Sequence, residues 1–266
     1  MILTILSIVS FIMMIAFIPI MVLTFRGRLQ FLQGVLLSSG AILLSFVASI
    51  SELNMKMGQN IINIAINKSF EQIKQTFETV STEQLQKMLG NITADQATAF
   101  RGEIANTLVY ISDMYTLLFP AIMILSILAF CFVAFMLIKL ILGLFKFDVS
   151  NFPMFSEFKI SKTSIIALFV SLFGASAFPI HTINAAFLNI AVVIIGAMAV
   201  CGFSLFDFQV RKKVDNSWAR MLIYVAIIVV GFSLSSIIIY LLVFAAILDS
   251  FFDFRKLSPK EEKDGQ

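Results

Sequence analysis

The stretch MYTLLFPAIMILSILAFCFVAFMLIKLILG, residues 114–143, decides the fold class of this chain. Its only charged side chain is Lys139, and a helix needs about 20 apolar residues to cross the hydrocarbon core of a bilayer. Three more apolar runs reach that length, at residues 2–25, 30–50 and 184–206. The sequence therefore predicts an all-α, polytopic integral membrane protein, a helical bundle.

The composition agrees with a chain surrounded by lipid. Of its 266 residues, 59% are hydrophobic and 13% are charged, whereas a soluble domain has about a quarter of its residues charged. This excludes a disordered chain, a nucleic-acid-binding domain and a soluble enzyme. The net charge of +3 is too small to indicate a polyanionic partner. We therefore expect the lipid bilayer, and no nucleic acid, as a partner.

Two further apolar segments complete the bundle. Residues 164–179 form a shorter run, and the uncharged turn 180–182 joins it to the 184–206 run, which predicts a tight helical hairpin. The last run, 221–248, exceeds one crossing and falls short of two. We expect it to form two short passes broken near residues 231–236.

A repeated pattern supports that division of the last run. The pentapeptides Ser204–Phe208 and Ser250–Phe254 are alike, and basic residues follow both, as at two cytoplasmic exits of a span. This interpretation gives seven crossings. Six crossings, with the C-terminus outside, is the alternative.

Charge placement predicts the topology, because Lys and Arg favour the cytoplasmic side. Basic residues gather in three loops: Arg26 and Arg28; Lys146, Lys159 and Lys162; Arg211, Lys212 and Lys213. The segment 51–113 carries seven acidic and five basic side chains and is assigned to the outside. The N-terminus then starts outside. The expected organisation is two transmembrane helices in 1–50, an extracytoplasmic amphipathic helical segment in 51–113, a membrane bundle in 114–254 and a charged cytoplasmic tail in 255–266, disordered after Pro259.

The extracytoplasmic segment has an amphipathic helical pattern. Its apolar residues recur at spacings of three and four: Ile62, Ile66, Phe70, Ile73, Phe77 and Val80. Two capping boxes, Ser81 with Gln84 and Thr93 with Gln96, predict further helix starts. The first of these starts a short helix with Leu85, Met88 and Leu89 on one face and Gly90 at its end. We expect a helical hairpin that rests on the membrane surface or on its neighbours, and a partner-binding or lid role is the alternative.

The spans offer little chemistry. Four charged residues lie near the ends of apolar runs, where we expect their side chains to reach the interface: Asp113, Lys139, Asp207 and Asp249. One histidine and two cysteines cannot supply a four-ligand zinc site. Gly-Phe-Ser-Leu at 202–205 and 231–234 lacks the second glycine of a GxSG nucleophile motif. We therefore expect no catalytic residue, metal or cofactor, and no enzyme.

Two groups of residues are candidate sites. His181, Asn184 and Asn189 follow the hairpin turn and form a candidate solute-binding pocket, although amides of this kind also serve to pack helices. A candidate cytoplasmic interface comprises Arg26, Arg28, Phe158, Lys159, Asp253 and Arg255. The loop that carries Phe145, Phe147, Phe152, Phe155 and Phe158 is most simply interfacial, with aromatic rings at the headgroups. Docking of a cytoplasmic partner is the alternative for this loop.

Four places in the chain resemble the YybS-like family of predicted bacterial membrane proteins. They are Ile18–Ile20 with Arg26-Gly27, Phe119–Ala121, Phe155–Phe158 and Leu248–Lys256. Phe158 and Phe251 stand where that family has tryptophan, and the family usually has one more span before Pro19. The resemblance implies a bacterial cytoplasmic membrane protein with no established activity.

That family is in turn distantly similar to the substrate-binding S components of energy-coupling-factor transporters. This similarity implies a small-molecule ligand captured from outside and other membrane subunits, with a partner that hydrolyses ATP. We therefore expect the small-molecule-binding membrane subunit of a transporter. The alternative is a membrane scaffold or regulatory protein without transport or catalysis.

Overall fold

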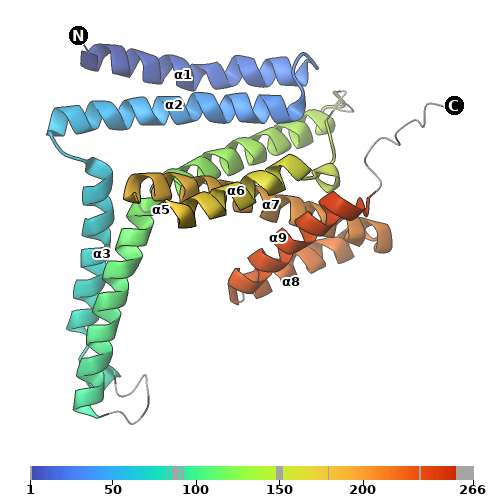
Figure 1. Cartoon of the computed structure of the whole chain (residues 1–266). Helices are drawn as coiled ribbons and strands as arrows, with labels where there is room; N and C mark the ends of the chain where they lie inside the picture. The colour runs from blue at the N-terminus through green and yellow to red at the C-terminus, as the bar shows by residue number, and fades with distance from the viewer. Residues whose placement is uncertain are drawn as a thin grey trace. The chain divides into compact units, whose positions relative to one another are not determined.

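A computed structural model describes residues 2–81, 83–85, 90, 93–147, 152–178, 180–233 and 235–255 of the chain. All regular structure in these ranges is helical (Figure 1). The elements are α1 (Ile2–Phe25), α2 (Phe31–Met57), α3 (Ile61–Thr79), α5 (Ala94–Leu144), the 3₁₀ turn η1 (Phe155–Glu157), α6 (Lys162–Ala177), α7 (His181–Lys213), α8 (Ser217–Ser233) and α9 (Ser235–Phe252). The chain divides into two compact units, residues 1–23 with 33–131, and residues 24–32 with 132–266.

The helices confirm the predicted class of membrane protein. Four are long and apolar enough to cross a bilayer: Leu3–Phe25, Phe31–Met57, Asp95–Leu144 and His181–Lys213. The apolar helices α6, α8 and α9 are shorter. Large apolar side chains are widely exposed, among them Phe11 and Phe169 at 63%, as expected where lipid replaces water. Seven crossings remains a prediction.

In the first unit, α1 and α2 form an antiparallel hairpin (Figure 1). Serine hydroxyl groups bond across the two helices. The Ser10 hydroxyl lies 2.9 Å from the Ser45 hydroxyl and 2.7 Å from that of Ser49. Near the N-terminal end of α1, the Ser7 hydroxyl donates to the Glu52 carboxylate at 2.6 Å. Small residues let the helices approach, and their hydroxyls bond across the interface.

The same unit contains an antiparallel two-helix arm, which we define as α3 with residues 94–115 of α5. Both predicted capping boxes are confirmed by reciprocal bonds, at 3.2 and 3.0 Å between Ser81 and Gln84 and at 3.3 and 2.9 Å between Thr93 and Gln96. The predicted helix residues Met88 and Leu89 lie outside the described residues. Helix α5 runs from the arm into the 114–143 span without a break at residue 113.

In the second unit, α7 packs against α6 and α9. Their common core consists of Ile165, Leu168, Ala191, Met198 and Ala246. Gly202 allows a close crossing, because a Cβ atom at this position would overlap the carbonyl oxygen of Leu242 in α9. The α6–α7 hairpin is confirmed, although α7 already begins at His181. The 221–248 run is divided as predicted, since α8 ends at Ser233 and α9 begins at Ser235.

Candidate functional site

A buried ionic cluster lies where α7, α9 and η1 meet in the second unit. We call it the Arg255 cluster and define it as Arg255, Asp249 and Ser204 with the carbonyl groups of residues 155, 156 and 158. The side chains of Arg255 and Asp249 are each 1% exposed. Oδ2 of Asp249 accepts from Nε of Arg255 at 3.0 Å and from Nη2 at 2.5 Å.

The other N–H groups of the guanidinium group bind the loop before α6, at residues 156 and 158. Nη1 of Arg255 donates to the carbonyl of Ser156 at 2.7 Å and to the Ser204 hydroxyl at 2.8 Å, and Nη2 donates to the carbonyl of Phe158 at 2.9 Å. Ser204 in turn donates to the carbonyl of Phe155 at 2.6 Å. A buried charge is tolerated when it is paired and hydrogen-bonded, as the guanidinium group is here, whereas Oδ1 of Asp249 has no partner among the described residues. The cluster therefore holds two helices and a loop in one arrangement.

Three of the four charged residues near the ends of the apolar runs bond to groups of the protein, and their place at the membrane interface stays a prediction. Asp249 is buried as described, and Asp207 is 3% exposed. Asp207 accepts from Nε of Arg211 at 2.8 Å and from the Tyr224 hydroxyl. Lys139 donates to the carbonyls of Phe152 and Pro153 at 3.1 and 3.2 Å. Asp113, in contrast, is exposed.

The structure brings together four of the six residues of the predicted cytoplasmic interface. Lys159 and Asp253 form an ion pair at 2.7 Å, and Arg255 bonds to the carbonyl of Phe158. Arg255 is 6% exposed, so it stabilises this end of the unit from within and does not present a charge at the surface. Arg26 and Arg28 are exposed in the turn between α1 and α2.

Three aromatic residues of the same loop pack against rings of α2 and α5, and their depth at the headgroups stays a prediction. Phe31 lies 5.5 Å, ring to ring, from both Phe152 and Phe158, and Phe132 lies 5.3 Å from Phe158. Phe155 joins them at 6.0 Å from Phe132. Two loop aromatics do stay exposed, Phe145 at 72% and Phe147 at 64%.

The residues of the predicted solute pocket make local contacts. His181 is the first residue of α7 and is exposed. The Asn184 amide donates to the carbonyl of Ala175 and so closes the α6–α7 hairpin. The Asn189 amide donates to the carbonyl of Ala185, one turn back in α7, at 2.8 Å. The solute pocket therefore stays a prediction, and the amide groups of both asparagines already donate to backbone carbonyls.

A polar cavity lies elsewhere, between the two helices of the arm. Its volume is about 190 Å³. It is lined by Asn67, Phe70, Glu71 and Lys74 of α3 and by Leu108, Val109, Ser112 and Asp113 of α5. The Ser112 hydroxyl donates to Oδ1 of Asn67 at 3.4 Å, and the rings of Phe70 and Tyr115 lie 5.6 Å apart. We call this cavity the arm cavity.

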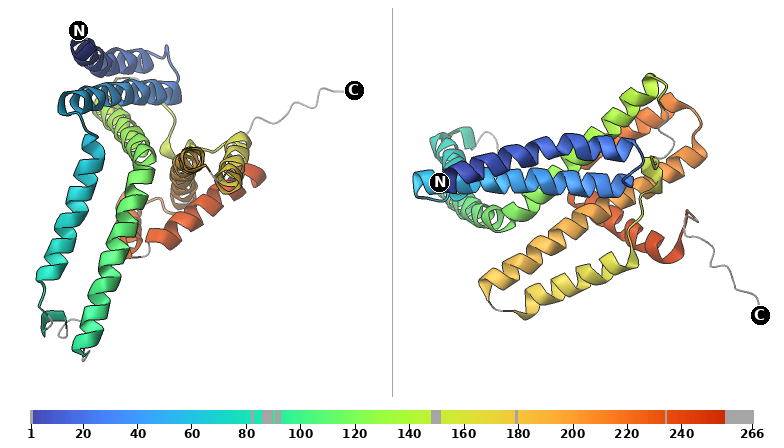
Figure 2. Two further views of the ribbon diagram at one scale, coloured as in Figure 1. Left: turned by 60° about the vertical axis from the view of Figure 1, so that its left-hand side comes forward. Right: turned by 90° about the horizontal axis from the view of Figure 1, so that it is seen from above.

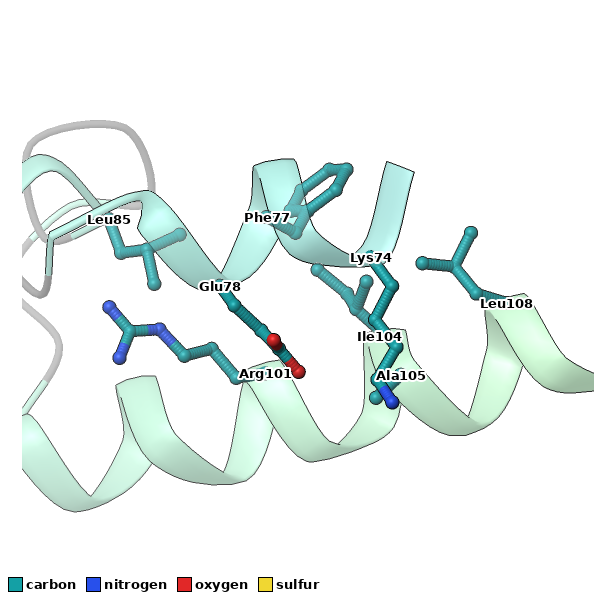
Figure 3. Close-up of a pocket in the computed structure, with 8 residues that line it drawn as sticks. All are labelled: Lys74, Phe77, Glu78, Leu85, Arg101, Ile104, Ala105 and Leu108. Atoms are coloured by element: carbon teal, nitrogen blue, oxygen red, sulfur yellow. The ribbon is translucent and has the colours of Figure 1, made fainter. Parts of the chain in front are cut away.

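A second, smaller cavity continues along the arm and holds the volume of about one water, 20 Å³ (Figure 3). Lys74 borders both cavities and reaches across to Ala105. At the far end, Arg101 donates to the carbonyl of Val80, while its buried Nε has no partner among the described residues.

The arm cavity was not predicted from the sequence. The sequence does show the polar stripe on its α3 side, because Asn67, Glu71 and Lys74 recur at spacings of four and three. Its α5 side depends on the pairing of the two helices, which no local pattern indicates.

Comparison with known proteins assigns the family. No curated protein and no solved structure matches this chain significantly. One family model matches residues 1–249, and its description is predicted membrane protein, DUF2232. Since this match covers nearly the whole chain, the protein belongs to the DUF2232 family of predicted membrane proteins.

Proposed function

We propose that this chain is the small-molecule-binding membrane subunit of a transporter, as the resemblance to the YybS-like family and to S components implies. The observation that carries the proposal is the arm cavity. It lies in the segment that the charge pattern assigns to the outside of the cytoplasmic membrane, with the N-terminus outside and the C-terminus inside. A solute would be captured there before transport.

The chemistry of the arm cavity fits a small polar solute. A volume of 190 Å³ exceeds the roughly 150 Å³ that accommodates benzene in an engineered protein cavity. Glu71, Lys74 and Asp113 supply charges of both signs, and Phe70 and Leu108 supply apolar walls. Polar groups that converge on one cavity fix the orientation of a ligand. The cavity is thus better placed for this role than the pocket predicted around Asn184 and Asn189, whose amides are engaged.

We also propose that the chain is not an enzyme. Ser204 is the serine of one of the two Gly-Phe-Ser-Leu sequences that come nearest to a nucleophile motif. Its hydroxyl accepts from Arg255 and donates to the carbonyl of Phe155, which leaves no hydrogen for a general base to remove without breaking the cluster.

A membrane scaffold or regulatory protein is the second candidate. The amide of Asn184 favours it, because it joins α7 to α6 in the region where a pocket was expected, and the amide of Asn189 bonds within α7. In this case the protein would hold other membrane subunits and bind no solute.

Native mass spectrometry of the protein purified in detergent from its host membrane distinguishes the two functions. We expect a discrete small molecule on the wild type, lost on Asp113→Asn and kept on the matched control Glu103→Gln, an exposed carboxylate of α5 that does not line the cavity. Lys74→Gln and Lys68→Gln form a second pair of the same design. A wild type that carries only lipid and other proteins would refute solute capture and support the scaffold.

A further inference from the structure

The arm has an apolar flank to which both of its helices contribute. Residues advance by about 100° each around a helix. On α3, the side that faces α5 is marked by the cavity residues Asn67 and Lys74. Ile62, Ile66 and Ile73 lie about a quarter turn from that side. No residue of α3 is buried, and Ile73 and Phe77 remain 43% and 41% exposed.

Helix α5 repeats this arrangement. Ser112 and Arg101 face α3, and the apolar residues Phe100, Ile104 and Ile111 lie about a quarter turn away, in the same rotational sense along the helix. Because the two helices are antiparallel, equal rotations bring their apolar stripes to the same flank of the arm. Tyr115 extends this flank, stays 51% exposed and contacts the ring of Phe70.

The opposite flank is polar. On α3 it carries Lys68, Gln72, Gln75 and Thr79, and on α5 it carries Asp95, Asn106 and Asp113, all of them exposed. Ile61, Ile64 and Val109 are its apolar exceptions. Several residues of the arm cavity, Glu71 and Asp113 among them, turn toward this flank.

The position of the arm within its unit indicates what covers the apolar flank. Figures 1 and 2 show α3 and the first part of α5 running across the direction of α1 and α2. Only residues 58–60 separate α2 from α3, and α5 continues directly into a span. If α1 and α2 cross the bilayer, the arm therefore runs along its surface, continuous with helices that are long and apolar enough to span it.

We infer that the arm lies in the headgroup region of the outer leaflet, with its apolar flank toward the acyl chains. Amphipathic helices bind membranes in this way. Its polar flank, and with it the mouth of the arm cavity, then faces water. The arm is an interfacial element that orients the cavity, and this inference needs no ligand to be tested.

Spin labels at two neighbouring positions of α3 test this orientation. In a Cys131→Ala, Cys201→Ala background, Ile73→Cys and its matched control Gln75→Cys place a nitroxide on opposite flanks of the full-length protein. The protein is reconstituted into phosphatidylglycerol–phosphatidylcholine vesicles. Collision rates are measured with oxygen, which concentrates in lipid, and with a water-soluble nickel chelate.

We expect a several-fold higher ratio of oxygen to nickel collisions at position 73 than at position 75. An equal, water-like ratio at both would overturn the inference, because the arm would then stand in solvent. A label at position 73 shielded from both reagents would also overturn it, since protein and not lipid would cover the flank. Ile104→Cys with Asn106→Cys repeats the test on α5 if an α3 variant fails to fold.

Discussion

Charged side chains are used differently in the two units. In the Arg255 cluster, Arg255 and Asp249 are buried, and the guanidinium group makes five hydrogen bonds to fixed protein groups. In the arm, Glu71 and Asp113 are exposed beside a cavity. Buried charges whose partners are all protein groups stabilise one conformation, whereas charges beside a cavity remain available to a ligand. The difference therefore separates charges that are engaged within the fold from charges that line a cavity.

The largest expected effect is the loss of the buried guanidinium group. Arg255→Met leaves the Asp249 carboxylate buried without its partner, which lowers the free energy of unfolding by about 3–5 kcal/mol. Unfolding by denaturing detergent, followed by circular dichroism, measures this loss. The exposed Arg26→Met is the control and should change little. Equal stability of the two variants would show that the cluster is not structural.

Next in size is the effect of a methyl group at the crossing of α7 and α9. Gly202→Ala places a Cβ atom against the backbone of Leu242, and overpacking of this kind costs about 1–3 kcal/mol. Gly143→Ala is the matched control, because nothing lies within 4 Å of its added Cβ. The same unfolding assay compares them. A stable Gly202→Ala protein would mean that α7 and α9 do not cross so closely.

The smallest effect is expected between α1 and α2. Ser10→Ala removes the hydroxyl that bonds to Ser45 and Ser49, and interhelical bonds of this type contribute about 0.6 kcal/mol in membranes. Ser69→Ala, whose hydroxyl bonds only within α3 at the carbonyl of Ala65, should cost less. A loss in Ser10→Ala no larger than in this control would show that the serine contacts do not hold the hairpin.

The sequence was sufficient for features that depend on local patterns. Apolar length predicted the long spans, and the capping boxes at Ser81 and Thr93 predicted hydrogen bonds that form. The burial of Arg255 was not predicted, because its partners include backbone carbonyls of residues 156 and 158, which come close to it only through tertiary packing. Asp249 is buried with it as its ion-pair partner. The amides of Asn184 and Asn189 were ambiguous for a similar reason, since an amide in a span serves a ligand or a carbonyl equally well.

The central claim is that the charges of the arm serve a ligand and not the fold. Thermal unfolding of the wild type and of Lys74→Gln, each as purified and after exhaustive dialysis in detergent, tests it most directly. A bound ligand at 100 times its dissociation constant stabilises a protein by about 2.7 kcal/mol. We predict that dialysis lowers the wild-type midpoint to that of Lys74→Gln, which itself does not change. A midpoint for Lys74→Gln that matches the wild type before and after dialysis would contradict the account.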